Sequence, residues 1–165
     1  MNAELRQLLN AFNKYRDARI NLLTQLRLPD SCRDPLSEFS EALVAAVLRA
    51  QLAENRVQEG FDMITPTGER VEVKYLSNPS TEWRNWHTIK FTPLRDKYAL
   101  VYYEDLSPKA IFVFPRQGLQ EICQALGKRH DRQETELQFT KNNYRDLTKS
   151  PERFQRLGMQ IILLE

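Results

Sequence analysis

The segment GFDMITPTGERVEVKYL, residues 60–76, has two apolar-rich runs on either side of a Thr-Pro-Thr-Gly turn. Two such runs joined by turn residues predict a β-hairpin. With the turn centred near Thr67, residues whose numbers sum to about 134 lie opposite each other in the antiparallel pair, and their Cβ atoms are about 5 Å apart. This register places Asp62 opposite Glu72 on one face of the hairpin.

The face that carries Asp62 and Glu72 also receives Lys74, because side chains two residues apart on a strand point the same way. Val71 and Val73 alternate with these charges and are expected to point into a core. Two opposed carboxylates repel each other, and a shared divalent cation such as Mg²⁺ would remove that penalty. A register shifted by one residue would separate the carboxylates, and an exposed face with solvated charges is the alternative interpretation.

A helix is predicted before the hairpin, with Asp34 as the N-cap, Pro35 at the first helical position and an end near Ala53. Its first apolar stripe comprises Leu36, Phe39, Leu43, Val47 and Ala50. Glu41 lies on roughly the opposite side, within a second apolar stripe, so the helix is expected to be buried. A buried carboxylate needs a partner, and the charged face of the hairpin is one candidate. The alternative is a capping or salt-bridging role, for which Glu38 is better placed.

The remaining sequence alternates between helical and strand patterns. Leucine and aromatic residues at helical spacing over residues 3–26 predict one long helix or two short ones. Residues 77–96, with two prolines, predict a loop or a partly extended excursion. Further strands are expected at 98–105, 109–115, 135–140 and 159–165, and further helices at 116–127, 142–147 and 150–157. This mixture on a short chain indicates an α/β fold with a mixed central sheet flanked by helices.

The composition is that of an ordinary globular protein. A chain of 165 residues predicts a single domain with a substantial core. Its longest apolar runs are too short to span a bilayer, and its first residues lack a signal-peptide pattern, so a cytoplasmic location is expected. Cys32 and Cys123 make neither a disulfide framework nor a metal cluster, which predicts two reduced thiols. A net charge of +2 neither requires nor excludes a nucleic-acid partner.

In their order along the chain, these elements resemble the active-site core of the PD-(D/E)XK nuclease superfamily, the restriction-endonuclease-like fold. The resemblance is carried by Glu41 on a helix, Asp62 on a strand, a turn, and then Glu72-Val73-Lys74. It covers about residues 36–115 and is greatest for small bacterial and phage-type members. One departure is Phe61, which stands where the motif's name has proline. The resemblance implies one nuclease-like domain, with an N-terminal helical segment at 1–30, a catalytic core at 34–115, and C-terminal helices, a basic patch and a last strand at 116–165.

The resemblance also implies a role for each of these residues. Asp62 and Glu72 would bind Mg²⁺, or Mn²⁺ as a substitute, together with the backbone carbonyl of Val73. Lys74 would orient or deprotonate the attacking water, and Glu41 would hold a metal-bound water or a second ion. Phosphodiester hydrolysis needs such a water and stabilisation of charge on the phosphorane, which a divalent cation and an ammonium supply. The chain has no Gly-x-Ser-x-Gly motif, and its histidines and cysteines lack zinc-site spacing.

Two segments are rich in residue types that contact nucleic acids. Residues 82–91 interleave aromatic and basic side chains, and the basic members are Arg84, His87 and Lys90. In residues 127–149 the candidates for bonds to phosphates and base edges are Arg129, His130, Arg132, Lys141, Asn142, Asn143 and Arg145. The alternatives are that Trp83 and Trp86 fill the core and that the second segment is a solvated loop.

The resulting hypothesis is a Mg²⁺-dependent endonuclease of restriction type that cleaves double-stranded DNA. A homodimer that pairs through the leucines of residues 5–26 would match a palindromic site, and packing of these leucines in the core is the alternative. A repair, recombination or mobile-element nuclease is the nearest variant. A nonenzymatic nucleic-acid-binding or assembly protein with this fold is the alternative from another class, and a scaffold with no nucleic-acid role is a third. No membrane partner is expected.

Overall fold

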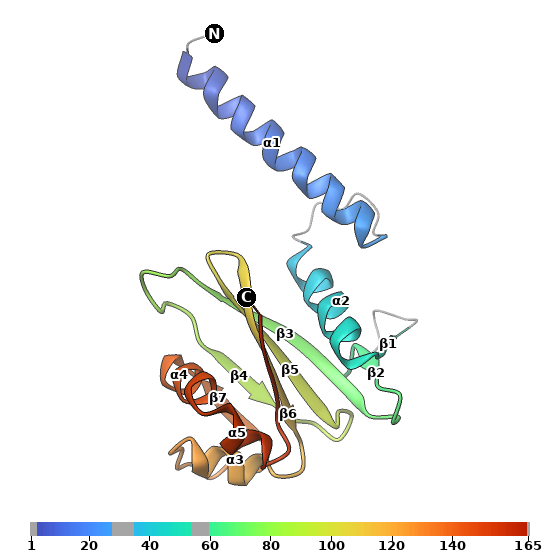
Figure 1. The fold of residues 1–165 in the computed structure, drawn as a ribbon, viewed down its shortest axis with the longest axis vertical. Helices are drawn as coiled ribbons and strands as arrows, with labels where there is room; N and C mark the ends of the chain where they lie inside the picture. The colour runs from blue at the N-terminus through green and yellow to red at the C-terminus, as the bar shows by residue number, and fades with distance from the viewer. Residues whose placement is uncertain (1–2, 28–34, 54–59, 165) are drawn as a thin grey trace.

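The centre of the computed structural model is a six-stranded mixed sheet in the order β1-β2-β3-β5-β6-β8 (Figure 1). The structure describes residues 3–27, 35–53 and 60–164, with side chains from residue 13 onward. The strands of this sheet are β1 (Gln51–Leu52), β2 (Met63–Ile64), β3 (Arg70–Asn78), β5 (Lys97–Glu104), β6 (Ser107–Pro115) and β8 (Gln160–Leu163). β3 and β5 run parallel, and the other neighbouring pairs run antiparallel. The predicted α/β class with a mixed central sheet is therefore confirmed.

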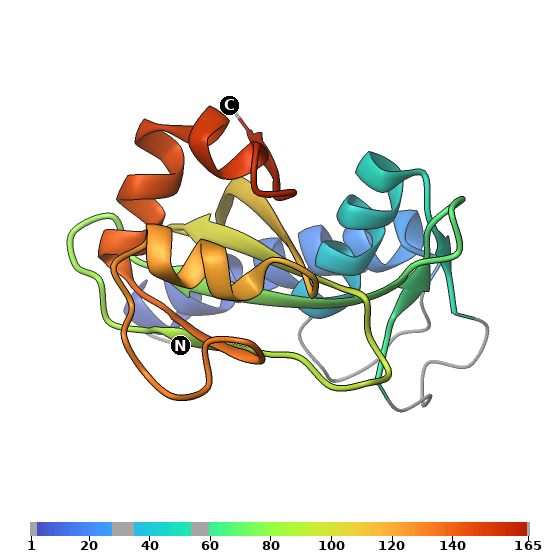
Figure 2. The same ribbon diagram turned by 90° about the horizontal axis from the view of Figure 1, so that it is seen from below.

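Helices and a second small sheet cover the central sheet. The described helices are α1 (Ala3–Gln25), α2 (Leu36–Leu48), α3 (Leu119–Ala125), α4 (Lys141–Lys149) and α5 (Pro151–Gln155). The small sheet pairs β4 (His87–Lys90) with β7 (Glu136–Phe139). α2 shares a core with one face of the central sheet, while β4, β7 and α3–α5 share a core with the other face. Figure 2 shows α3, α4 and α5 grouped together, apart from α2.

The alternation predicted for β3 separates these two cores. Val71 and Val73 are buried in the core beneath α2, together with Val101 and Val113 of β5 and β6. Leu76 is buried in the opposite core, so the residues at even positions of β3 face that side. Glu72 and Lys74 therefore lie on the face of the sheet that α2 does not cover.

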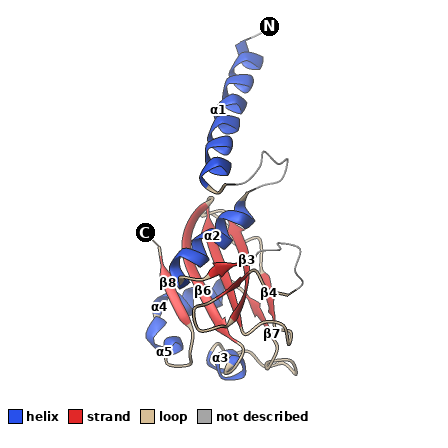
Figure 3. Ribbon diagram, turned by 90° about the vertical axis from the view of Figure 1, so that its right-hand side faces the viewer, coloured by secondary structure: helices blue, strands red, loops and turns tan. Residues whose placement is uncertain are grey.

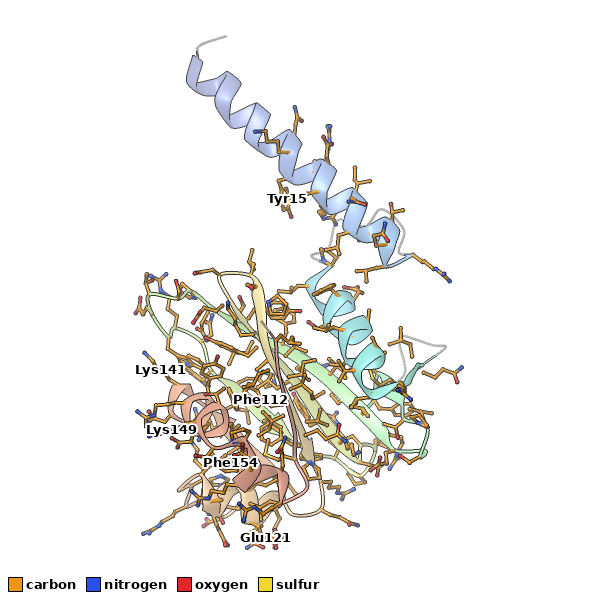
Figure 4. The ribbon with its side chains drawn as sticks, in the orientation of Figure 1. Tyr15, Phe112, Glu121, Lys141, Lys149 and Phe154 are labelled. Atoms are coloured by element: carbon orange, nitrogen blue, oxygen red, sulfur yellow. The ribbon has the colours of Figure 1, made fainter. Side chains whose placement is uncertain are left out.

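β5 and β6 form the middle of the molecule. Their central residues are buried on both faces, which explains why both strands appear in the sequence as continuous apolar runs. Tyr102 and Phe112, for example, are completely buried on one face, whereas Val101 and Ile111 are buried on the other. Figure 4 shows Phe112 in the interior of the sheet.

Three features near the N-terminus differ from or refine the sequence prediction. α1 is a single helix, and Figure 3 shows that it extends away from the sheet. α2 ends at Leu48 and not near Ala53, because Arg49 adopts a left-handed conformation with a φ of 53°. The residues after Arg49 are thereby released to form β1, which had been expected to be helical. The predicted N-cap Asp34 and Cys32 lie outside the described residues, and Pro35 occupies the N-cap position.

The helices and strands after β3 lie close to their predicted positions, and the structure adds one strand, β4. Residues 77–96, predicted to be a loop or a partly extended excursion, contain β4, which pairs with β7. None of the described helices is long and apolar enough to cross a membrane.

Candidate active site

The turn between β2 and β3 sets the register that the sequence predicts. Met63 pairs with Val71 and Ile64 pairs with Arg70. The turn is closed by a hydrogen bond from the N–H of Gly68 to the carbonyl of Thr65, and the φ of Gly68 is 82°, a conformation that suits glycine. In the same register, the residue before Met63, Asp62, lies opposite Glu72.

Asp62 lies just before β2 and binds the edge of β3 through both its backbone and its side chain. Its N–H donates to the carbonyl of Val71 at 2.8 Å. Its Oδ2 accepts a hydrogen bond from the N–H of Val73 at 2.6 Å. The carboxylate is therefore fixed beside the strand edge, between the two faces of the sheet.

Glu72 is buried, and its two carboxylate oxygens face different cations. Nζ of Lys74 lies 2.5 Å from Oε1 of Glu72, and Nη2 of Arg95 lies 3.8 Å from Oε2. The side chain of Glu72 is 10% exposed and that of Lys74 is 45% exposed. The predicted glutamate and lysine are thus in contact, and the lysine remains open to solvent.

The pKa of Asp62 is set by its burial and by the charges around it. Burial raises the pKa of the Asp62 carboxyl above its ordinary value of 3.8, and the negative charge of Glu72 raises it further. The hydrogen bond from Val73 and the positive charges of Lys74 and Arg95 oppose that increase. The structure therefore gathers an aspartate, a glutamate and two cations around the edge of β3.

Glu41 reaches the same region from the other side of the strand. It lines a polar pocket of about 120 Å³ together with Glu38, Asp62 and Phe61. The hydroxyl of Ser37 lies 3.5 Å from Oε1 of Glu41. Asp62 is the residue that connects this pocket, on the α2 side, to the Glu72–Lys74 pair on the opposite face. Glu38, which the sequence favoured for a capping role, is also buried at this pocket.

Tyr98 and Arg95 belong to the site but had not been proposed from the sequence. Tyr98 lies beside Glu72 in the parallel pair of β3 and β5. Its hydroxyl is 2.6 Å from Nε2 of His87. Burial lowers the pKa of His87, and the positive charge of Lys74 lowers it further. His87, expected to contact DNA from an exposed loop, is instead partly buried next to the charged cluster.

The donor atoms at this site are the kind that Mg²⁺ binds. Within the described part of the chain, no group of three or more His, Cys, Asp or Glu side chains is arranged to hold a metal ion. Mg²⁺ is commonly bound by only one or two protein carboxylates, with water and substrate phosphates completing its shell. Asp62 and Glu72 supply two carboxylates whose mutual repulsion a cation would relieve. Their oxygen chemistry therefore fits a magnesium ion.

The first predicted DNA-contacting segment is divided between the core and the surface. Trp83 stacks on Tyr102 with ring centres 5.0 Å apart, as its core alternative predicted, whereas Trp86 is 64% exposed. Arg84 and Lys90 are exposed. Arg84 pairs with Glu82, and Lys90 lies 3.5 Å from Glu136.

The second segment requires one correction. Asn143 is 1% exposed, and its Oδ1 accepts hydrogen bonds from the N–H and hydroxyl of Thr140, so it caps α4 and is not available to DNA. Arg132 is exposed and pairs with Glu136. The other candidates are exposed: Arg129, His130, Lys141, Asn142 and Arg145.

A pocket brings part of the two segments together. It has a volume of about 290 Å³, and Trp83, Lys141, Asn142, Tyr144 and Arg145 contribute to its lining. α4 thus places basic side chains next to the loop that carries Trp83. Basic and aromatic side chains, with Glu82 and Glu104 among them, therefore gather on the face of the sheet that also carries Glu72 and Lys74.

No protein-family model matches the chain, and no curated protein matches its sequence. The residues around Asp62 and Glu72 are therefore the basis of the functional proposal.

Proposed function

We propose that the protein is a Mg²⁺-dependent endonuclease of PD-(D/E)XK type that hydrolyses phosphodiester bonds in double-stranded DNA. The observation that carries this proposal is the position of Asp62 at the edge of β3. Its carboxylate accepts a hydrogen bond from the N–H of Val73 and borders the same pocket as Glu41. It also interacts electrostatically with Glu72 and Lys74.

The order of the elements supports a restriction-endonuclease-like core. α2 carries Glu41, the β2–β3 hairpin carries the aspartate and the Glu-Val-Lys sequence, and β5 and β6 extend the sheet beyond β3. Parallel pairing of β3 with β5 places Tyr98 beside Glu72, and the central residues of β5 are buried on both faces. The sheet thereby provides a rigid support for the acidic cluster.

Asp62, Glu72 and the carbonyl of Val73 would hold the Mg²⁺, and Glu41 would hold a bound water or a second ion. The backbone N–H of Val73 points to Asp62, and in a strand the carbonyl of the same residue points to the same edge. When bound, the cation would activate a water molecule and offset negative charge at the phosphate. Lys74 is sufficiently exposed to contact the scissile phosphate and to orient the attacking water.

The pocket at α4, which Glu82 and Glu104 line as well as Lys141 and Arg145, would hold the DNA backbone beside the site. Tyr102, at this pocket, lies four residues beyond Tyr98 in β5, which corresponds to about 13 Å along the strand. Lys141 and Arg145 would contact phosphates on that side. We further propose that two copies act together on the two DNA strands, with α1 providing contact between copies. Restriction is the biological role favoured, and repair, recombination or mobile-element transfer is the nearest variant.

Cleavage of a supercoiled plasmid in the presence of Mg²⁺ tests the proposal. Asp62→Asn, Glu72→Gln and Lys74→Met should each abolish cleavage, and a chelator should stop the unmodified protein. Glu121→Gln on α3 is the matched control for the carboxylate variants, because Figure 4 shows Glu121 on a helix remote from α2. Loss of cleavage in this control, or no loss in the site variants, would contradict the assignment. Binding without cleavage, unchanged in the site variants, would favour a nonenzymatic nucleic-acid-binding protein.

A further inference from the structure

Arg95 is a second cation at Glu72 that the proposed chemistry does not use. It lies in the segment between β4 and β5, and its side chain is 15% exposed. Its Nη1 donates to the carbonyl of Lys90 at 3.1 Å, and its guanidinium carbon lies 5.9 Å from the centre of the Tyr98 ring. These contacts hold the guanidinium in place beneath the carboxylate.

The two cations at Glu72 differ in their freedom to move. Lys74 contacts Oε1 from the same strand, and its long aliphatic chain is 45% exposed. Arg95 approaches Oε2 from a different segment and is mostly buried. Removing the only partner of a buried charge is strongly destabilising. With Arg95 in place, Lys74 can move away from Glu72, and the buried carboxylate still has a positive partner.

Arg95 also has unused capacity to bind a carboxylate. Its Nε is buried and has no hydrogen-bond partner within the described residues. Its Nη2 lies 3.8 Å from Oε2 of Glu72, which is an ion pair and too long for a hydrogen bond. A guanidinium can bind a carboxylate through two parallel N–H groups, so a small approach of Glu72 would complete this arrangement.

We propose that Arg95 is a positioning residue, which remains the counter-ion of Glu72 while Lys74 moves from Glu72 to the substrate phosphate. The movement of Lys74 rests on the proposed nuclease function. The sharing of Glu72 by two cations does not, and it can be measured in the free protein.

Urea unfolding of single and double variants tests this sharing. Lys74→Met and Arg95→Gln are made singly and together, both in the natural sequence and with Glu72→Gln. Each single variant retains one cation at Glu72, whereas the double variant leaves the carboxylate without one. The double variant should therefore change the unfolding equilibrium constant by about tenfold more than the product of the single changes, and Glu72→Gln should remove this coupling. Additive effects, or coupling that persists with Glu72→Gln, would overturn the proposal.

Cleavage kinetics test the positioning role. Arg95→Gln should lower kcat about 10- to 100-fold with little change in KM, and Arg95→Lys should recover most of the loss because it restores a positive charge. A rise in KM with kcat unchanged would show that Arg95 binds substrate directly and would overturn the role. If the natural protein cleaves no DNA, the nuclease assignment fails, and the unfolding experiment still decides whether Arg95 and Lys74 share Glu72.

Discussion

Oδ2 of Asp62 accepts a hydrogen bond of 2.6 Å from the backbone N–H of Val73, whose side chain is buried beneath α2. The residues on either side of Val73, Glu72 and Lys74, face the opposite side of the sheet. This hydrogen bond, together with the one from the Asp62 N–H to the carbonyl of Val71, fixes the aspartate at the strand edge between the two faces. The aspartate therefore borders the pocket of Glu41 and also interacts with the Glu72–Lys74 pair.

Asp62→Asn should stabilise the protein at neutral pH while abolishing cleavage. Because burial raises the pKa of Asp62 above 3.8, the folded protein binds this proton more tightly than the unfolded chain does. The contribution of Asp62 to stability therefore falls as the pH rises from the ordinary pKa of an aspartate, in the unfolded chain, through the raised pKa in the folded protein. It remains low at neutral pH. Asparagine removes the charge and keeps an oxygen that can accept the N–H of Val73.

Urea unfolding at neutral and at acid pH measures this effect. The variant should be more stable than the natural protein at neutral pH, and the difference should shrink as the pH falls below the raised pKa. A variant that is less stable at neutral pH would show that the Asp62 charge stabilises the fold, contrary to this expectation.

The titration of His87 should report the position of Lys74. Burial lowers the pKa of His87, and the positive charge of Lys74 lowers it further. Lys74→Met removes the second cause and leaves the first, so the pKa of His87 should rise but stay below its ordinary value of 6.5. NMR titration of the imidazole signals measures the change, with His130 as the internal reference. An unchanged His87 titration would place the ammonium too far away to act on the ring.

Tyr103→Phe should weaken the attachment of α2 to the central sheet. The hydroxyls of Tyr103 and Ser40 are 2.9 Å apart in the buried interface between β5 and α2. Loss of this hydrogen bond should reduce the free energy of unfolding by about 1 kcal/mol, because Ser40 retains its bond to the carbonyl of Leu36. Urea unfolding measures the change. Tyr75→Phe, at a half-exposed ring, is the matched control and should have a smaller effect.

Lys141 and Arg145 should contribute to DNA affinity through phosphates. Each alanine variant should weaken binding and reduce the slope of log affinity against log salt by about one. Fluorescence anisotropy of labelled duplex DNA, with a chelator present to prevent cleavage, measures both quantities. A slope identical to that of the natural protein would exclude phosphate contact at these positions.

Asn143→Ala provides the contrasting case on the same helix. Its side chain caps α4 by accepting hydrogen bonds from Thr140. The variant should lose about 1 kcal/mol of unfolding free energy and leave the salt dependence of DNA binding unchanged. A reduced salt slope, measured on the folded variant, would show instead that Asn143 has a role in binding.

Local patterns in the sequence were sufficient to predict the central part of the fold. Strict alternation of valine with charge fixed the faces of β3, and the turn near Thr67 gave the observed register, because a one-residue shift would have exposed Val71 and Val73. The early end of α2 could not be foreseen, since Arg49 takes a left-handed conformation that glycine or asparagine usually signals.

The sequence did not reveal Tyr98 and Arg95 as site residues, because strands that are distant in the sequence bring them to Glu72. Tyr98 lies next to Glu72 only because β3 and β5 pair in parallel, and no periodicity within a short window reveals that register. The same pairing brings Arg95 to Glu72. His87 was expected at an exposed loop because β4 is short and its partner β7 is distant in the sequence.

The parallel pairing of β3 with β5 also imposes an order on folding. The β5–β6 hairpin joins strands separated by a two-residue turn and can form early, whereas β3 can reach β5 only after the chain from residue 79 to 96 has crossed over. Glu72 meets Arg95 and Tyr98 in that later step. A refolding chain can therefore contain the β5–β6 hairpin before Glu72, Arg95 and Tyr98 come together.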